Sequence, residues 1–193
     1  MSEIIDSKLS PSDVLAQNPE ITCPPRILQK LGLVAVDYIG FDERVHSGQI
    51  IVEKSLLIDV REFFYQARKI HFPINKVVPA AAPDYSWDDE KLMEDNASSG
   101  FNYRLIAGTN KPSFRALGRA LDINPRQNPH IRYEDGKEIV KPDGAVWNPD
   151  APGTFHAEHP LVHLMEGFGW EWGGNWAQDK GRTDYQHFQK TSS

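Results

Sequence analysis

The segment from residue 113 to residue 125 constrains the fold and chemistry of this 193-residue chain more than any other. Its apolar part, residues 117–123, is typical of a buried strand, which Asn124-Pro125 would end. Asp122 therefore stands at the mouth of a strand. A carboxylate there can bind a metal, act as a catalytic base or cap the following turn, and spacing alone favours the turn cap.

Short strand-like segments alternate with a few helical ones along the rest of the chain. The spacing of apolar residues predicts a helix over 55–70, started by Ser55 and stopped by Pro73. Asp135-Gly136 between two strand-like runs predicts a β-hairpin. The acidic stretch 84–100 is expected to be a surface loop with one helical turn. Further strands are expected at 31–38, 49–52, 74–78, 101–106 and 185–189, and further helices at 10–17 and 160–168.

This mixture predicts a single α+β domain in which helices cover one face of a small antiparallel sheet. Residues 1–25 are polar and proline-rich, so we expect a loosely attached leader, followed by one domain over 26–193. Cys23 is the only cysteine, which excludes an internal disulfide.

Charge and hydropathy exclude several classes of partner. A net charge of −6 disfavours broad nucleic-acid binding, although four arginines between 115 and 132 leave a local basic patch as an alternative to a solvated face. No apolar run could span a bilayer, so no membrane partner is expected. The acidic N-terminus lacks a signal peptide. We therefore expect a cytoplasmic start, with release to the cell wall only by another route.

Two residues near the C-terminus extend the candidate chemistry. On a strand over 185–189, His187 shares a face with Tyr185, and a single such histidine is more often a hydrogen-bonded core residue than a ligand. Asp184 precedes His187 by three residues, a distance at which a carboxylate can act as a general base beside a bound metal.

Three ordered motifs carry a family resemblance. They are Ser-x-x-x-x-Gly-x-Ala-x-Asp from Ser113, Trp-x-Trp-Gly-Gly-x-Trp from Trp170, and Asp-x-x-His-Phe from Asp184. Together with residues 95–104 and 124–129, they resemble the D-alanyl-D-alanine carboxypeptidase and L-alanyl-D-glutamate endopeptidase family of zinc metallopeptidases, over roughly residues 33–189. The resemblance implies a hedgehog/DD-peptidase-like fold and a peptidoglycan stem peptide as substrate.

The resemblance also implies roles for individual residues. Asp122 and His187 would be zinc ligands, and Asp184 would take the proton of a zinc-bound water. Arg104 would steady the substrate carbonyl or the oxyanion. The positions of Ser113, Trp172 and Trp176 imply contacts with the substrate, while simple core packing is the alternative for the tryptophans.

Arg115 departs from the family motif, which has a zinc-binding histidine at this position. A guanidinium is always charged and offers no lone pair, so it cannot replace that ligand. We expect weakened zinc binding and an ion pair of Arg115 with Asp122 or Asp184 in place of the metal. Alternatively, His156, His159 or His163 could supply a replacement ligand or simply be surface histidines.

Three functions therefore remain open. The chain could be a stem-peptide hydrolase with an impaired or rearranged metal site. It could be a pseudoenzyme that binds a peptide or cell-wall fragment in the same groove without cutting it. It could also be a non-catalytic partner protein that uses the fold as a scaffold.

Overall fold

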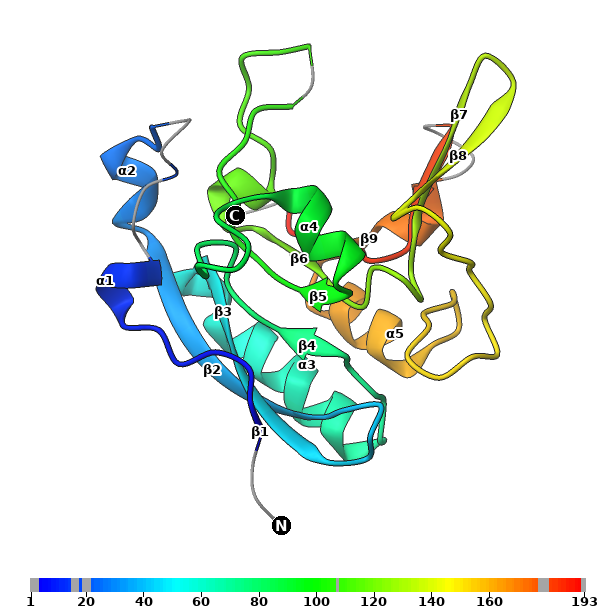
Figure 1. Cartoon of the computed structure of the whole chain (residues 1–193), viewed down its shortest axis with the longest axis horizontal. Coiled ribbons are helices and arrows are strands. Elements are labelled where there is room, and N and C mark those ends of the chain that lie inside the picture. The colour runs from blue at the N-terminus through cyan, green and yellow to red at the C-terminus, as the bar shows by residue number, and fades with distance from the viewer. Residues whose placement is uncertain (1–3, 15–17, 19–21, 107, 177–180, 192–193) are drawn as a thin grey trace.

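The computed structural model describes residues 4–14, 18, 22–106, 108–176 and 181–191. They form a mixed α+β structure with four small sheets instead of the one sheet expected (Figure 1). The helices are α1 (Pro11–Val14), α2 (Pro25–Leu28), α3 (Leu57–Lys69), α4 (Asp89–Glu94) and α5 (Pro160–Gly167), with 3₁₀ turns η1 (Lys54–Leu56), η2 (Arg115–Leu117) and η3 (Gly173–Trp176). The strands are β1 (Ile4–Ile5), β2 (Leu31–Ile39), β3 (Val45–Glu53), β4 (Lys76–Val77), β5 (Ala97–Ser98), β6 (Ala120–Asp122), β7 (His130–Glu134), β8 (Lys137–Lys141), β9 (Glu171–Trp172), β10 (Arg182–Asp184) and β11 (His187–Gln189).

The longest pair of strands, β2 and β3, supports the main helix. The two run antiparallel over nine residues each, and α3 lies across them (Figure 1). Val60, Phe63, Phe64 and Ala67 of α3 recur at helical spacing and are buried against this pair, which confirms the predicted helix. Its start differs, since η1 precedes it and no side chain caps it.

A second sheet, in the order β6-β11-β9, positions the residues of interest. Leu121 pairs with Phe188 and both are fully buried in the main core. Because side chains alternate along a strand, the next pair, Asp122 and His187, points to the opposite face. The buried apolar pair thus fixes the register that brings the two polar residues together.

The predicted hairpin is confirmed as β7–β8, which projects from the body of the molecule (Figure 1). Its turn residues Asp135 and Gly136 both have positive φ, as a two-residue hairpin turn requires. Strand β10, which was not predicted separately from β11, pairs with β7 and sets Asp184 opposite His130.

Two sequence predictions are wrong. Residues 101–106 form no strand; the backbone of Phe101 instead donates to Ile51 O, while its ring packs in a second core with Tyr103. The acidic stretch 84–100 contains the expected helical turn as α4, but its remainder is no surface loop, because it contains β5 and residues 96–100 are buried. The β4–β5 pairing draws this stretch into the protein.

The start of the chain is attached where the structure describes it. Strand β1 pairs parallel to β3, and Gln49 accepts hydrogen bonds from Ser7 Oγ and Leu9 N at 2.7 Å each. Helix α1 occupies part of the predicted 10–17 helix, whose residues 15–17 lie outside the described part. No helix in the described ranges has the length and apolar character needed to cross a membrane.

Candidate functional site

Asp122 and His187 form the centre of the site. They are register partners on β6 and β11, and His187 Nδ1 lies 2.7 Å from Asp122 Oδ1. His187 Nε2 lies 3.2 Å from Gln189 Oε1, and the amide nitrogen of Gln189 donates to Glu171 at 2.9 Å. Both ring nitrogens of His187 therefore face oxygen acceptors, an arrangement that suits the protonated ring.

Arg115 reaches this centre from η2. Ser113 Oγ accepts a hydrogen bond from Ala116 N at 3.1 Å and so caps this turn. Gly118, in the left-handed conformation with φ 69°, ends it. A short turn held at both ends directs the Arg115 side chain inward, where only 2% of it is exposed.

The Arg115 guanidinium is enclosed by oxygen atoms. It pairs with Asp122 Oδ2 at 2.7 Å and with Asp89 of α4. Its Nη2 donates to Ser99 Oγ at 2.5 Å, and its Nε donates to Gly100 O at 3.1 Å. The ion pair expected between Arg115 and Asp122 is therefore present, with Asp89 as a second carboxylate that the sequence did not reveal.

The pKa values follow from these contacts. Burial alone would raise the pKa of Asp122, but Arg115 and the bond from His187 hold it well below its ordinary value. Burial lowers the pKa of His187, yet the hydrogen bond and charge of Asp122 outweigh it and raise that pKa. The centre therefore sets the guanidinium of Arg115, and a histidine whose pKa is raised, against the carboxyl groups of Asp122 and Asp89.

Asp184 and His130 lie beside this centre on paired strands. Burial raises the pKa of Asp184, and the nearby charge of Asp122 adds to the effect while His187 opposes it. Burial lowers the pKa of His130. Among the described residues, Asp184 Oδ1 and His130 Nε2 have no hydrogen-bond partner. Burial thus disfavours the charged form of both groups beside this centre.

Arg104 and Trp176 lie at the edge of the site. Arg104 Nη2 is 3.4 Å from Asp89 Oδ2, and about half of the arginine side chain is exposed (48%). The Trp176 ring lies 5.4 Å from the His187 ring, and the Arg182 guanidinium lies over the tryptophan. The predicted positions of Arg104, Asp122, Asp184, His187 and Trp176 therefore gather in one region.

Ser113 and Trp172 have structural contacts of their own. Ser113 caps η2 as described, and Trp172 is buried in the main core with its indole N–H donating to Tyr185 O at 2.8 Å. For Trp172, the packing alternative therefore accounts for its position. Substrate contacts by either residue stay predictions.

The residues gathered here do not fit a zinc ion. Both oxygens of Asp122 are engaged, and both ring nitrogens of His187 already lie within hydrogen-bond distance of oxygen atoms, one of Asp122 and one of Gln189. A permanent cation, Arg115, fills the third ligand position. In the described part of the chain, no group of three or more His, Cys, Asp or Glu side chains could hold a metal ion.

The histidines at 156, 159 and 163 do not supply a replacement zinc ligand to this site. His159 Nδ1 accepts from Leu161 N at 3.2 Å as the N-cap of α5, and its ring packs edge-on against Phe72 and Phe155. His163 is exposed and lies 3.8 Å from Glu158. Of the two interpretations of these histidines, the metal site is not supported.

Asp89 and Ser99 are the site residues that sequence reasoning missed. Both lie in the stretch 84–100 that was assigned to the surface, and each meets Arg115 only through tertiary contacts. An acidic segment is normally assigned to the solvent-exposed surface. The only sequence signal for a buried carboxylate partner was Arg115, a cation in a motif expected to be buried.

Comparison with known proteins supports the resemblance for the C-terminal part. Residues 107–190 match the family model described as D-alanyl-D-alanine carboxypeptidase. No curated protein and no solved structure matches the chain significantly, so the hedgehog-like fold stays a prediction. The matched region includes Arg115, Asp122, Asp184 and His187, whereas Asp89 and Arg104 lie before it. Residues 107–190 are a domain of the D-alanyl-D-alanine carboxypeptidase family.

Proposed function

We propose that this protein binds peptidoglycan stem peptides, or a similar small peptide, without cutting them by zinc chemistry. The family of residues 107–190 supports the substrate class. The observation that carries the loss of catalysis is the burial of Arg115 between Asp122 and Asp89. Hydrolysis with a rearranged metal site is the alternative.

Charge balance supports this proposal. The carboxyl groups of Asp122 and Asp89 already pair with Arg115, so a dication would have to displace a buried guanidinium that has no route to deprotonation. Together with His187, these three side chains make a fixed hydrogen-bonded centre without any metal. These contacts therefore hold the centre together, although the zinc chemistry implied by the family is lost.

Peptide binding would use the exposed groups at the edge of this centre. Arg104 offers a half-exposed cation to a peptide carboxylate, and Trp176 offers an aromatic surface beside His187. Neither group depends on a metal. This separation allows recognition to persist after hydrolysis is lost.

Metal analysis tests the loss of zinc. The unaltered protein, dialysed against zinc and then metal-free buffer, should retain only traces. Arg115→His should take up near-stoichiometric zinc, because it restores the missing ligand and frees Asp122. Asp89 would keep Arg104 as a cationic partner in this variant. Arg61→His, an exposed change on α3, is the matched control and should bind none.

A pentapeptide ending in D-Ala-D-Ala tests the proposed peptide binding and the absence of cleavage. Calorimetry should detect its binding to the unaltered protein, and chromatography should detect no cleavage. Arg104→Gln should weaken binding by about tenfold if one charged contact is lost. Stoichiometric zinc together with cleavage by the unaltered protein would establish the hydrolase alternative instead, and absence of binding would remove the recognition function.

A further inference from the structure

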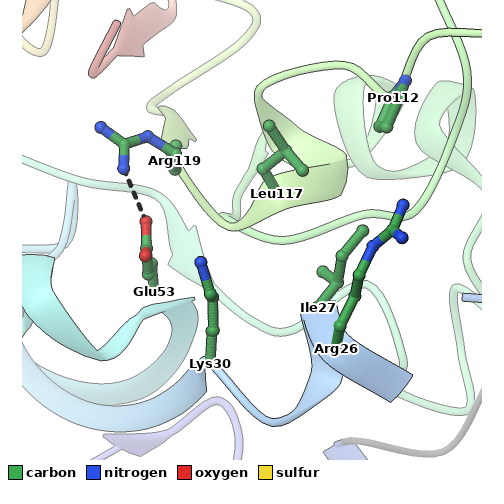
Figure 2. A pocket seen from close by; sticks show the side chains of 7 residues that line it. All are labelled: Arg26, Ile27, Lys30, Glu53, Pro112, Leu117 and Arg119. Atoms are coloured by element: carbon green, nitrogen blue, oxygen red, sulfur yellow. Dashed lines mark hydrogen bonds and ion pairs between the residues drawn. The ribbon is translucent and has the colours of Figure 1, made fainter. Parts of the chain in front are cut away.

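A second candidate site lies between α2 and the segment that follows η2. It is a cavity of about 240 Å³, smaller than the ~300 Å³ at which drug-sized ligand sites begin. Figure 2 shows the side chains around it, which come from α2 and the residue before β2, from the end of β3, and from η2 and the residues on either side of it. The lining residues are Arg26, Ile27, Lys30, Glu53, Pro112, Leu117 and Arg119.

The lining combines an apolar surface with cationic groups. Ile27, Leu117 and Pro112 supply the apolar part. An inorganic anion gains nothing from such a surface, whereas a hydrocarbon group loses contact with water there. The occupant is therefore expected to have an apolar part.

Charge at the cavity has the opposite sign to that of the whole chain. Three cations line it against a single carboxylate, Glu53, which is already paired with Arg119 at 2.8 Å. Within the described ranges, neither Arg26 nor Lys30 has an ion-pair partner. Two positive charges thus remain available at the cavity of a protein whose net charge is −6.

We propose that this cavity binds a small organic anion with an apolar part, such as a medium-chain carboxylate. The carboxylate would lie between Arg26 and Lys30, and the hydrocarbon would lie on Ile27 and Leu117. Charged hydrogen bonds then fix the head of the ligand, and burial of apolar surface holds its tail. This site is separate from the Arg115 centre and needs no metal.

The cavity nevertheless shares a chain segment with that centre. Leu117 and Arg119 line the cavity, while Arg115 and Asp122 of the same segment face the centre. Arg119 and Asp122 are three residues apart on an extended segment, about 10 Å at the usual rise per residue. The two sites therefore lie at opposite ends of the β6–β11 ladder. At the cavity end, Lys190 N donates a hydrogen bond to Arg119 O at 2.9 Å.

Octanoate is the probe for this proposal. Titrated into the full chain with methyl-labelled side chains, it should shift the Ile27 and Leu117 methyl resonances and saturate. Acetate, which lacks the tail, and octylamine, which has the opposite charge, should each bind at least about tenfold more weakly. The double variant Arg26→Gln/Lys30→Gln should lose about tenfold in octanoate affinity.

Arg61→Gln/Lys69→Gln is the matched control, because it removes two exposed cations of α3 and should leave octanoate affinity unchanged. Both double variants change exposed side chains, and their melting temperatures verify folding. Equal octanoate affinity in both double variants, or equal binding of octylamine, would overturn the proposal. So would binding to anionic lipid vesicles without any binding of soluble octanoate. Zinc uptake at the Arg115 centre would leave this result untouched.

Discussion

Arg115 Nη1 lies 2.7 Å from Asp122 Oδ2, and the two side chains are only 2% and 8% exposed. Burying an ion pair costs desolvation energy, which is recovered only when further hydrogen bonds satisfy both groups. Here Asp89, Ser99 and Gly100 accept hydrogen bonds from the guanidinium of Arg115, and His187 forms a hydrogen bond with the carboxylate of Asp122. The pair is thus one part of a continuous buried network.

The first prediction concerns this network. Arg115→Met would leave Asp122 buried without its cation, so we expect a loss of about 3–5 kcal/mol in the free energy of unfolding. Arg61→Met, at an exposed position on α3, should change it by less than about 0.5 kcal/mol. Urea denaturation measures both. Adding Asp122→Asn to Arg115→Met should recover part of the loss, and a neutral Arg115→Met would refute the account.

The second prediction concerns Asn128, which is fully buried. Its amide nitrogen donates to Ile123 O and Gly153 O, and its oxygen accepts from Phe155 N at 2.7 Å. Asn128→Ala leaves these backbone groups unsatisfied, so we expect a loss of about 2–4 kcal/mol. Asn175→Ala, on an exposed side chain, is the control and should cost under about 1 kcal/mol. Equal losses would show that the buried network adds nothing.

Local patterns were sufficient where the determining contacts are near in sequence. The hairpin at Asp135-Gly136 and the apolar face of α3 could both be predicted, because turn residues and helical spacing act over a few residues. The strand expected at 101–106 was wrong for the opposite reason. Phe101 and Tyr103 pack into a core with residues of α2 and β2, Leu105 is exposed, and among the described residues no strand pairs with the segment over that length.

In the candidate site, too, a contact between residues near in sequence could be predicted and one between distant segments could not. The family motif located Arg115 and Asp122, and the arginine in the place of a zinc ligand predicted an ion pair with Asp122 or Asp184, of which the Asp122 pair is present. Asp89 lies 26 residues from Arg115 in sequence and reaches it only because β4 and β5 pair and bring α4 over the centre. Such a partner follows from the tertiary fold and has no local signature.

The third prediction concerns Gly118, which ends η2 with a positive φ. A Cβ added there would lie 2.4 Å from Leu31 Cδ2 and 2.9 Å from Glu53 N. Gly118→Ala combines backbone strain with this overlap, so we expect a loss of about 2–4 kcal/mol in unfolding free energy. Gly167→Ala, at the last residue of α5, meets nothing within 4 Å and should be neutral or stabilising. Thermal melts compare the two, and a stable Gly118→Ala protein would contradict the packing argument.

The fourth prediction concerns His159, the N-cap of α5. Burial, followed by the charges of His156 and His163, lowers its pKa from 6.5 to about 4. The folded protein therefore prefers the neutral ring, and the cap itself needs an unprotonated Nδ1 to accept from Leu161 N. Below pH 6.5 the unfolded chain binds the proton first. Stability from this group is complete above pH 6.5 and falls as the pH is lowered toward 4.

His159→Asn keeps a side chain that can cap α5 but removes the titration. The variant loses ring contacts and should be less stable at pH 7.5, yet the difference from the unaltered protein should shrink by up to about 2 kcal/mol between pH 7 and pH 4.5, after allowance for partial exposure. Urea unfolding at several pH values measures this difference, in which the carboxylates common to both proteins cancel. His71→Asn, on the exposed loop after α3, is the control. A difference that stays constant with pH would show that His159 does not contribute to acid sensitivity.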